Sequence, residues 1–75
     1  MDAGIEKKIG ENIGKLREKA GLTQEETSAR LQVRGCDITR SALAKIEVGQ
    51  RHIYADEIIA FKNVLGVSYE DIFEI

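Results

Sequence analysis

The sequence has no proline and no tryptophan, and it contains only one cysteine and one histidine. A lone Cys36 cannot form an internal disulfide, and the sequence offers no Cys/His cluster for a metal site. We interpret Cys36 as a small side chain beside a turn and expect the protein in a reducing cytoplasm. We therefore expect no metal and no cofactor.

Long apolar runs are also missing. No stretch approaches the roughly 20 apolar residues that a membrane-spanning helix needs, and no signal-peptide pattern follows Met1. We therefore expect no membrane partner.

Patterns typical of enzymes are absent as well. The glycines form neither a phosphate-binding nor a dinucleotide-binding motif. His52 lies in a predicted loop, where we interpret it as a surface or phosphate-contacting side chain. Asp56 and Glu57 are adjacent on a predicted helix, so their side chains diverge and cannot act as an acid/base pair. We expect no catalytic residue, no enzymatic activity and no small-molecule substrate.

What is present is the composition of a folded domain. The chain has 75 residues, of which 43% are hydrophobic and 32% charged. This length predicts a single domain over residues 1–75.

The charge is unevenly distributed, although the formal net charge is only −2. Residues 30–52 hold five basic and two acidic side chains, net +3, whereas residues 53–75 hold one basic and five acidic side chains, net −4. Because local potential governs the choice of a charged partner, residues 30–52 remain candidates for binding nucleic acid.

Periodicity and capping signals predict an all-α fold of five helices. A stripe of Ile5, Ile9, Ile13 and Leu16 predicts a helix over about 5–20. Thr23-x-x-Glu26 is a capping box that opens a second helix, and Thr39 is the expected N-cap of a third, over 40–48. A fourth is expected over 55–65, and a short fifth follows the capping-box pattern Ser68-x-x-Asp71. Helix stops are predicted at Gly21, Gly35, Gly49 and Gly66.

Two glycines fall inside the first predicted helix. Gly10 and Gly14 each weaken it by roughly 1 kcal/mol relative to alanine. They mark either the close approach of another backbone or a tolerated cost, and we favour the second interpretation.

The pair of helices over about 23–48 carries the functional signal. The N-terminal residues of a helix can reach base edges in the major groove, and Arg40 and Ser41 supply donors there, with Lys45 one turn further on. Gln24 begins the second helix, whose N-terminus can bind a phosphate. The alternative is that Arg40 and Lys45 belong to a solvated helix face, and we favour DNA contact.

Three segments in the same order, IGENIGKLREKAGLTQEE, TRSALAKIEVGQR and LGVSYEDIF, resemble the phage-repressor and Cro-type helix-turn-helix (XRE) family. The resemblance implies a compact five-helix bundle, similar to the lambda-repressor domain, that binds double-stranded operator DNA, commonly as a dimer. It also implies an ion pair between Arg17 and Glu47. With the pattern-based candidates, the expected DNA-binding residues are Gln24, Arg34, Thr39, Arg40, Ser41, Lys45, Gln50 and Arg51.

One departure from the family is the long turn RGCDI before Thr39. Either the second helix gains about a turn and ends at Gly35, or the loop itself is inserted. We favour the first, with Ile38 buried and Arg34 at the rim of the DNA face.

Two functions are compatible with these features. The first is a sequence-specific transcriptional regulator, a repressor that occupies its operator through the third helix. We expect it to pair through the C-terminal helix, with Ile75 at the interface and Phe73 in the core. No effector domain is expected after residue 75, so control would come from concentration or a partner. The alternative is a protein-interaction module of antitoxin or anti-activator type, which uses the acidic C-terminal third and binds DNA weakly.

Overall fold

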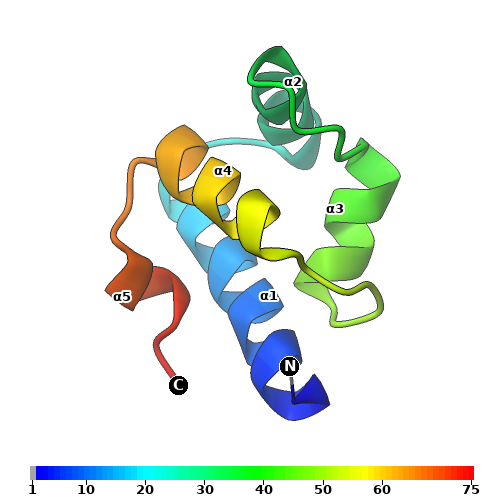
Figure 1. The fold of residues 1–75 in the computed structure, drawn as a ribbon. Coiled ribbons are helices and arrows are strands. Elements are labelled where there is room, and N and C mark those ends of the chain that lie inside the picture. Colours follow the sequence, from blue (N-terminus) through cyan, green and yellow to red (C-terminus); the bar gives the residue numbers. More distant parts are fainter. Residues whose placement is uncertain (1) are drawn as a thin grey trace.

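A computed structural model describes residues 2–75 and shows, over that range, a bundle of five helices without a strand (Figure 1). The helices are α1 (Ala3–Lys19), α2 (Gln24–Val33), α3 (Arg40–Glu47), α4 (Ala55–Leu65) and α5 (Tyr69–Ile72). In Figure 1, α1 runs through the lower half of the molecule, with α3 on one side and α5 on the other, while α4 crosses it and α2 lies at the top. The all-α, five-helix prediction is confirmed.

Local capping explains where most helices begin. In α2, the hydroxyl of Thr23 accepts from the Glu26 amide at 3.0 Å, and the Glu26 carboxylate accepts from the Thr23 amide at 2.9 Å. In α3, Thr39 Oγ1 accepts from the Ala42 amide at 3.1 Å. These caps satisfy amides that the first turn of a helix leaves without partners.

The first helix begins earlier than predicted. Asp2 caps it, since its carboxylate accepts from the Ile5 amide at 3.0 Å. Ile5 is 40% exposed, so it does not belong to the buried stripe that continues with Ile9 and Ile13.

Phe73, after the last helix, is 42% exposed, and its prediction as a core residue was wrong.

The core draws on every helix and both long connections. Phe61 is its largest fully buried side chain, and Ile38, in the turn between α2 and α3, is fully buried as predicted. The remaining members are Ile9, Ile13, Leu31, Leu43, Ile46, Ile53, Ile58, Leu65 and Ile72.

Gly10 corrects one of our interpretations. A Cβ atom at this position would lie 2.0 Å from the backbone carbonyl oxygen of Ile46. Because that oxygen belongs to the backbone of α3, a larger residue would push the two helices apart. Gly10 therefore permits a close approach of α1 and α3, and it is not a merely tolerated weakness.

The long turn after α2 is organised by side chains. The helix ends at Val33, Arg34 caps it, and Gly35 follows with φ of +82°, a conformation that favours glycine. The Ser28 hydroxyl then donates to the Ile38 carbonyl at 2.7 Å. The stop at Gly35 and the burial of Ile38 agree with the first of the two alternatives.

Candidate nucleic-acid interface

The two faces of α3 have different chemistry. Leu43 and Ile46 are buried against the rest of the bundle, whereas Arg40, Ser41 and Lys45 are exposed. Within residues 2–75, neither Arg40 nor Lys45 forms an ion pair. Both cations are therefore available to an external partner.

Glu47, the last residue of α3, is bound from two other helices. Its carboxylate accepts from Arg17 Nε at 2.7 Å and Nη2 at 3.0 Å, and from Gln24 Nε2 at 3.1 Å. Arg17 also donates to the Leu22 carbonyl at 2.8 Å. We call Arg17, Gln24 and Glu47 the carboxylate clamp. It joins α1, the first residue of α2 and the end of α3, so it fixes the orientation of α3 relative to α2.

The clamp is largely shielded from water. The side chains of Arg17 and Glu47 are 12% and 10% exposed. The hydrogen bonds from Arg17 to Glu47 raise the pKa of the guanidinium above its ordinary value, against the opposing effect of burial. A charge-assisted bidentate pair in such a place is stronger than one in open solvent.

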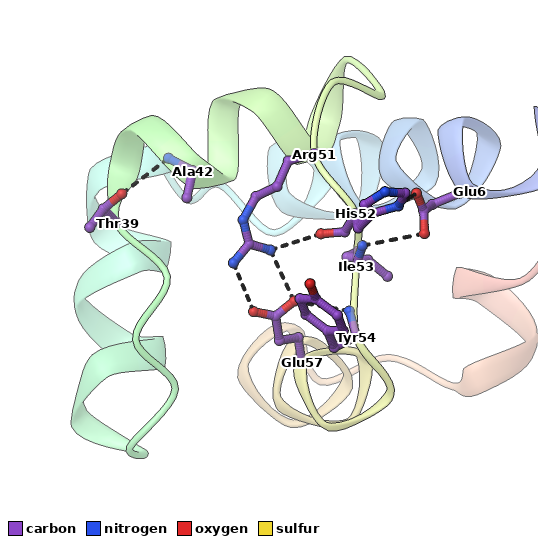
Figure 2. A network of polar contacts seen from close by, with 8 residues as sticks. All are labelled: Glu6, Thr39, Ala42, Arg51, His52, Ile53, Tyr54 and Glu57. Atoms are coloured by element: carbon purple, nitrogen blue, oxygen red, sulfur yellow. Dashed lines mark hydrogen bonds and ion pairs between the residues drawn. The ribbon is translucent and has the colours of Figure 1, made fainter. Parts of the chain in front are cut away.

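Arg51, in the loop after α3, is engaged within the protein (Figure 2). Its guanidinium donates to both carboxylate oxygens of Glu57 at 3.0 Å, and to the His52 carbonyl at 2.9 Å. Glu57 also accepts from the Tyr54 amide at 3.0 Å and thereby caps α4, where the Tyr54 side chain makes no cap. The guanidinium that we expected on a phosphate is thus held by a buried carboxylate.

The electrostatics of Glu57 follow from this arrangement. Burial by itself would raise the pKa of the carboxyl group. The hydrogen bonds from Arg51 and from the Tyr54 amide outweigh that effect, so the pKa lies below its ordinary value. Glu57 is therefore charged near neutral pH, and Arg51 is its counter-ion.

A second contact fastens the same loop to α1. Glu6 Oε1 lies 2.8 Å from His52 Nδ1, and Glu6 Oε2 accepts from the Ile53 amide at 3.4 Å (Figure 2). Burial opposes the charge on Glu6, but these hydrogen bonds lower its pKa. The loop that carries Gln50, which is exposed, is thus anchored to both α1 and α4.

The other predicted site residues lie apart from this anchored loop. Thr39 is exposed, and its hydroxyl serves as the cap of α3. Arg34 is exposed at the end of α2, where it lines a hollow beside α4 with Val33 and Val64. Arg34 thus lies beside α4, and its contact with DNA stays a prediction.

Sequence reasoning missed Glu57 and Asn12. Glu57 occupies the third position of α4, where a capping-box acid belongs, but Tyr54 in place of Ser or Thr concealed the signal. Asn12 is buried and donates to the Ile72 and Glu74 carbonyls at 2.9 and 2.7 Å. A buried Asn on an apolar stripe signals a polar partner, but it does not indicate which one.

Comparison with known protein families identifies the family of the chain. The sequence model of the helix-turn-helix family matches residues 13–72. The chain belongs to the Cro/C1-type (XRE) helix-turn-helix family. No curated protein and no solved structure gives a match.

Membership agrees with the structure, because the matched residues contain the C-terminal part of α1, from residue 13, and all of α2 to α5. The family is one of DNA-binding transcription regulators, so DNA is its partner. In helix-turn-helix proteins the second helix of the motif lies in the major groove, and α3 is the second helix of the motif in this chain. Within residues 2–75, no helix is both long enough and apolar enough to cross a membrane.

Proposed function

We propose that the protein is a sequence-specific transcriptional repressor that inserts α3 into the major groove of operator DNA. One observation carries this proposal: the exposed face of α3 presents unpaired Arg40 and Lys45 beside Ser41, while the carboxylate clamp holds that helix against α2. Base readout needs donors on a rigid element, and both conditions are met here.

Each residue has a distinct proposed role. Arg40, the first residue of α3, reads a guanine through its bidentate fork, and Ser41 and Lys45 contact base edges or phosphates nearby. Gln24 and Gln50 bind the DNA backbone on either side of the groove. Thr39 contributes by capping α3, which orients Arg40.

Repression follows from occupancy, because a protein bound across a promoter excludes the polymerase. A single small domain makes few contacts, so we propose that two copies bind half-sites about one helical turn apart. We place this activity in the cytoplasm.

The alternative is a protein-interaction module that holds DNA weakly. It is favoured by one observation: the exposed side chains of Glu70, Asp71 and Glu74 give the end of the chain an acidic surface that DNA would repel.

Selection of bound sites from a random DNA library, followed by titration at several salt concentrations, tests the proposal. We expect an enriched palindromic sequence and an affinity that falls by orders of magnitude between about 50 and 200 mM salt. Absence of binding to any duplex at low salt would refute the repressor proposal and leave the interaction module.

A further inference from the structure

A hollow of about 310 Å³ lies between the end of α2 and α4, and α3 takes no part in it. Its lining residues, which we call the basic groove, are Ala29, Arg30, Val33, Arg34 and Val64. Val33 is 88% exposed, more than any other large hydrophobic side chain in residues 2–75. So exposed a side chain adds little to the stability of the monomer, and its apolar surface is accessible to a partner.

The groove is also positively charged. Arg30 and Arg34 are both exposed, and within residues 2–75 neither forms an ion pair. The apolar side chains of the groove lie beside two unpaired guanidinium groups. Such a surface is complementary to a segment that presents apolar and acidic side chains together.

The protein itself carries such a segment. Residues 69–75, which we call the acidic ridge, expose Tyr69, Phe73 and Ile75 at 39%, 42% and 76%. The same residues expose three acidic side chains, those of Glu70, Asp71 and Glu74.

The acidic ridge is held in place before any partner arrives. Asn12 of α1 donates to two backbone carbonyls of the ridge, at 2.9 and 2.7 Å. A fixed ridge loses little conformational entropy when it docks.

The ridge cannot fill the groove of its own chain. In Figure 1, α5 lies low against α1, whereas α2 lies at the top of the molecule. α5 and α3 lie on opposite sides of α1 in that view. The ridge therefore lies on the side of α1 away from the helix that we propose to enter DNA.

We infer that two copies of the protein pair reciprocally, the acidic ridge of each lying in the basic groove of the other. Such exchange is closed by a twofold axis, so it ends at a dimer. The inference deepens the proposed function, on which its biological purpose rests, because it names the surfaces that pair the two DNA-binding units.

A charge-swap experiment by sedimentation equilibrium, without DNA, tests the inference. One variant carries Arg30→Glu and Arg34→Glu, and the other carries Glu70→Lys and Glu74→Lys. Each variant alone places like charges opposite each other, so we expect self-association to weaken at least tenfold. In an equimolar mixture both contacts are again complementary, so we expect a heterodimer with affinity near that of the wild type.

A matched control, Lys8→Glu with Lys15→Glu on α1, reverses two charges elsewhere and should leave the dimer intact. Circular dichroism establishes that each chain is folded, and Val33→Ser should weaken association without any change of charge. A monomeric wild type, unchanged association in the swapped variants, or failure of the mixture to recover would each overturn the inference. Weakened DNA binding by Arg30→Glu and Arg34→Glu with unchanged association would assign the groove to DNA instead. Because DNA is absent from the association measurement, its result is independent of whether α3 reads an operator.

Discussion

Removal of the Glu47 carboxylate should destabilise the fold far more than the loss of an ordinary surface ion pair. Glu47 accepts three hydrogen bonds, two from Arg17 and one from Gln24, and about nine-tenths of its side chain is shielded from water. An exposed pair contributes about 0–1 kcal/mol, whereas loss of one partner from a buried pair costs about 3–5 kcal/mol. At this level of shielding we expect Glu47→Ala to lower the free energy of unfolding by about 2–4 kcal/mol.

That loss is a large share of the total, because a domain of this length is stable by only about 4–11 kcal/mol. Urea denaturation followed by circular dichroism measures it in Glu47→Ala, Arg17→Ala and the double variant. Once Glu47 is gone, removal of Arg17 should cost little, so we expect a coupling energy of about 1–3 kcal/mol. If the two single losses simply add in the double variant, Arg17 and Glu47 do not act as a pair and the clamp does not hold α3.

Three further outcomes are expected. Arg40→Ala should cost about 1–3 kcal/mol of DNA affinity and relax the preference at one base pair; unchanged affinity and preference on the selected operator would show that Arg40 is not a reader. Gly10→Ala should lower the free energy of unfolding by about 1–3 kcal/mol, because its Cβ meets the backbone of α3, while Gly14→Ala, whose Cβ would lie 3.1 Å from the Glu47 carboxylate, needs only a small shift of that side chain and should cost less; equal thermal midpoints would contradict the close approach. The pKa of Glu57 is lowered in the folded state, so its contribution to stability is present above the unfolded pKa and is lost as pH falls through the folded pKa. Urea midpoints of the wild type and Glu57→Gln should therefore differ at neutral pH and converge between about pH 5 and pH 3, and a constant difference would refute the pairing with Arg51.

Local signals in the sequence were sufficient to predict the helices. Thr23 and Thr39 cap α2 and α3 through their own hydroxyls, and the apolar spacing of Ile9 and Ile13 defines the buried face of α1. Such features depend on residues within one or two turns of each other. They can be inferred without knowledge of the tertiary structure.

Features that depend on distant partners were not predictable in the same way. Gly10 is required because a carbonyl 36 residues later in the chain approaches it, and no local pattern records that distance. Arg51 illustrates the same limit for charge. A basic loop residue can bind a phosphate or a carboxylate. Only the folded chain shows that the Glu57 carboxylate accepts from both terminal guanidinium nitrogens of Arg51.

This difference between engaged and unengaged cations determines which basic residues can serve DNA. Arg17 and Arg51 are each held bidentately by a carboxylate that is mostly buried, so either would have to leave that carboxylate uncompensated in order to reach a phosphate. Arg40 and Lys45 form no ion pair within residues 2–75, and neither do the two arginines of the basic groove. These basic residues thus fall into two groups, those paired with a carboxylate of the bundle and those without an ion pair. Arg17 and Arg51, which face carboxylates, stabilise the bundle, whereas Arg40 and Lys45 lie unpaired on α3 and the arginines of the basic groove lie unpaired beside α4. Because α3 presents polar donors next to its cations whereas the groove presents Val33 and Val64, we propose DNA as the partner of the first surface and an acidic, apolar protein segment as the partner of the second.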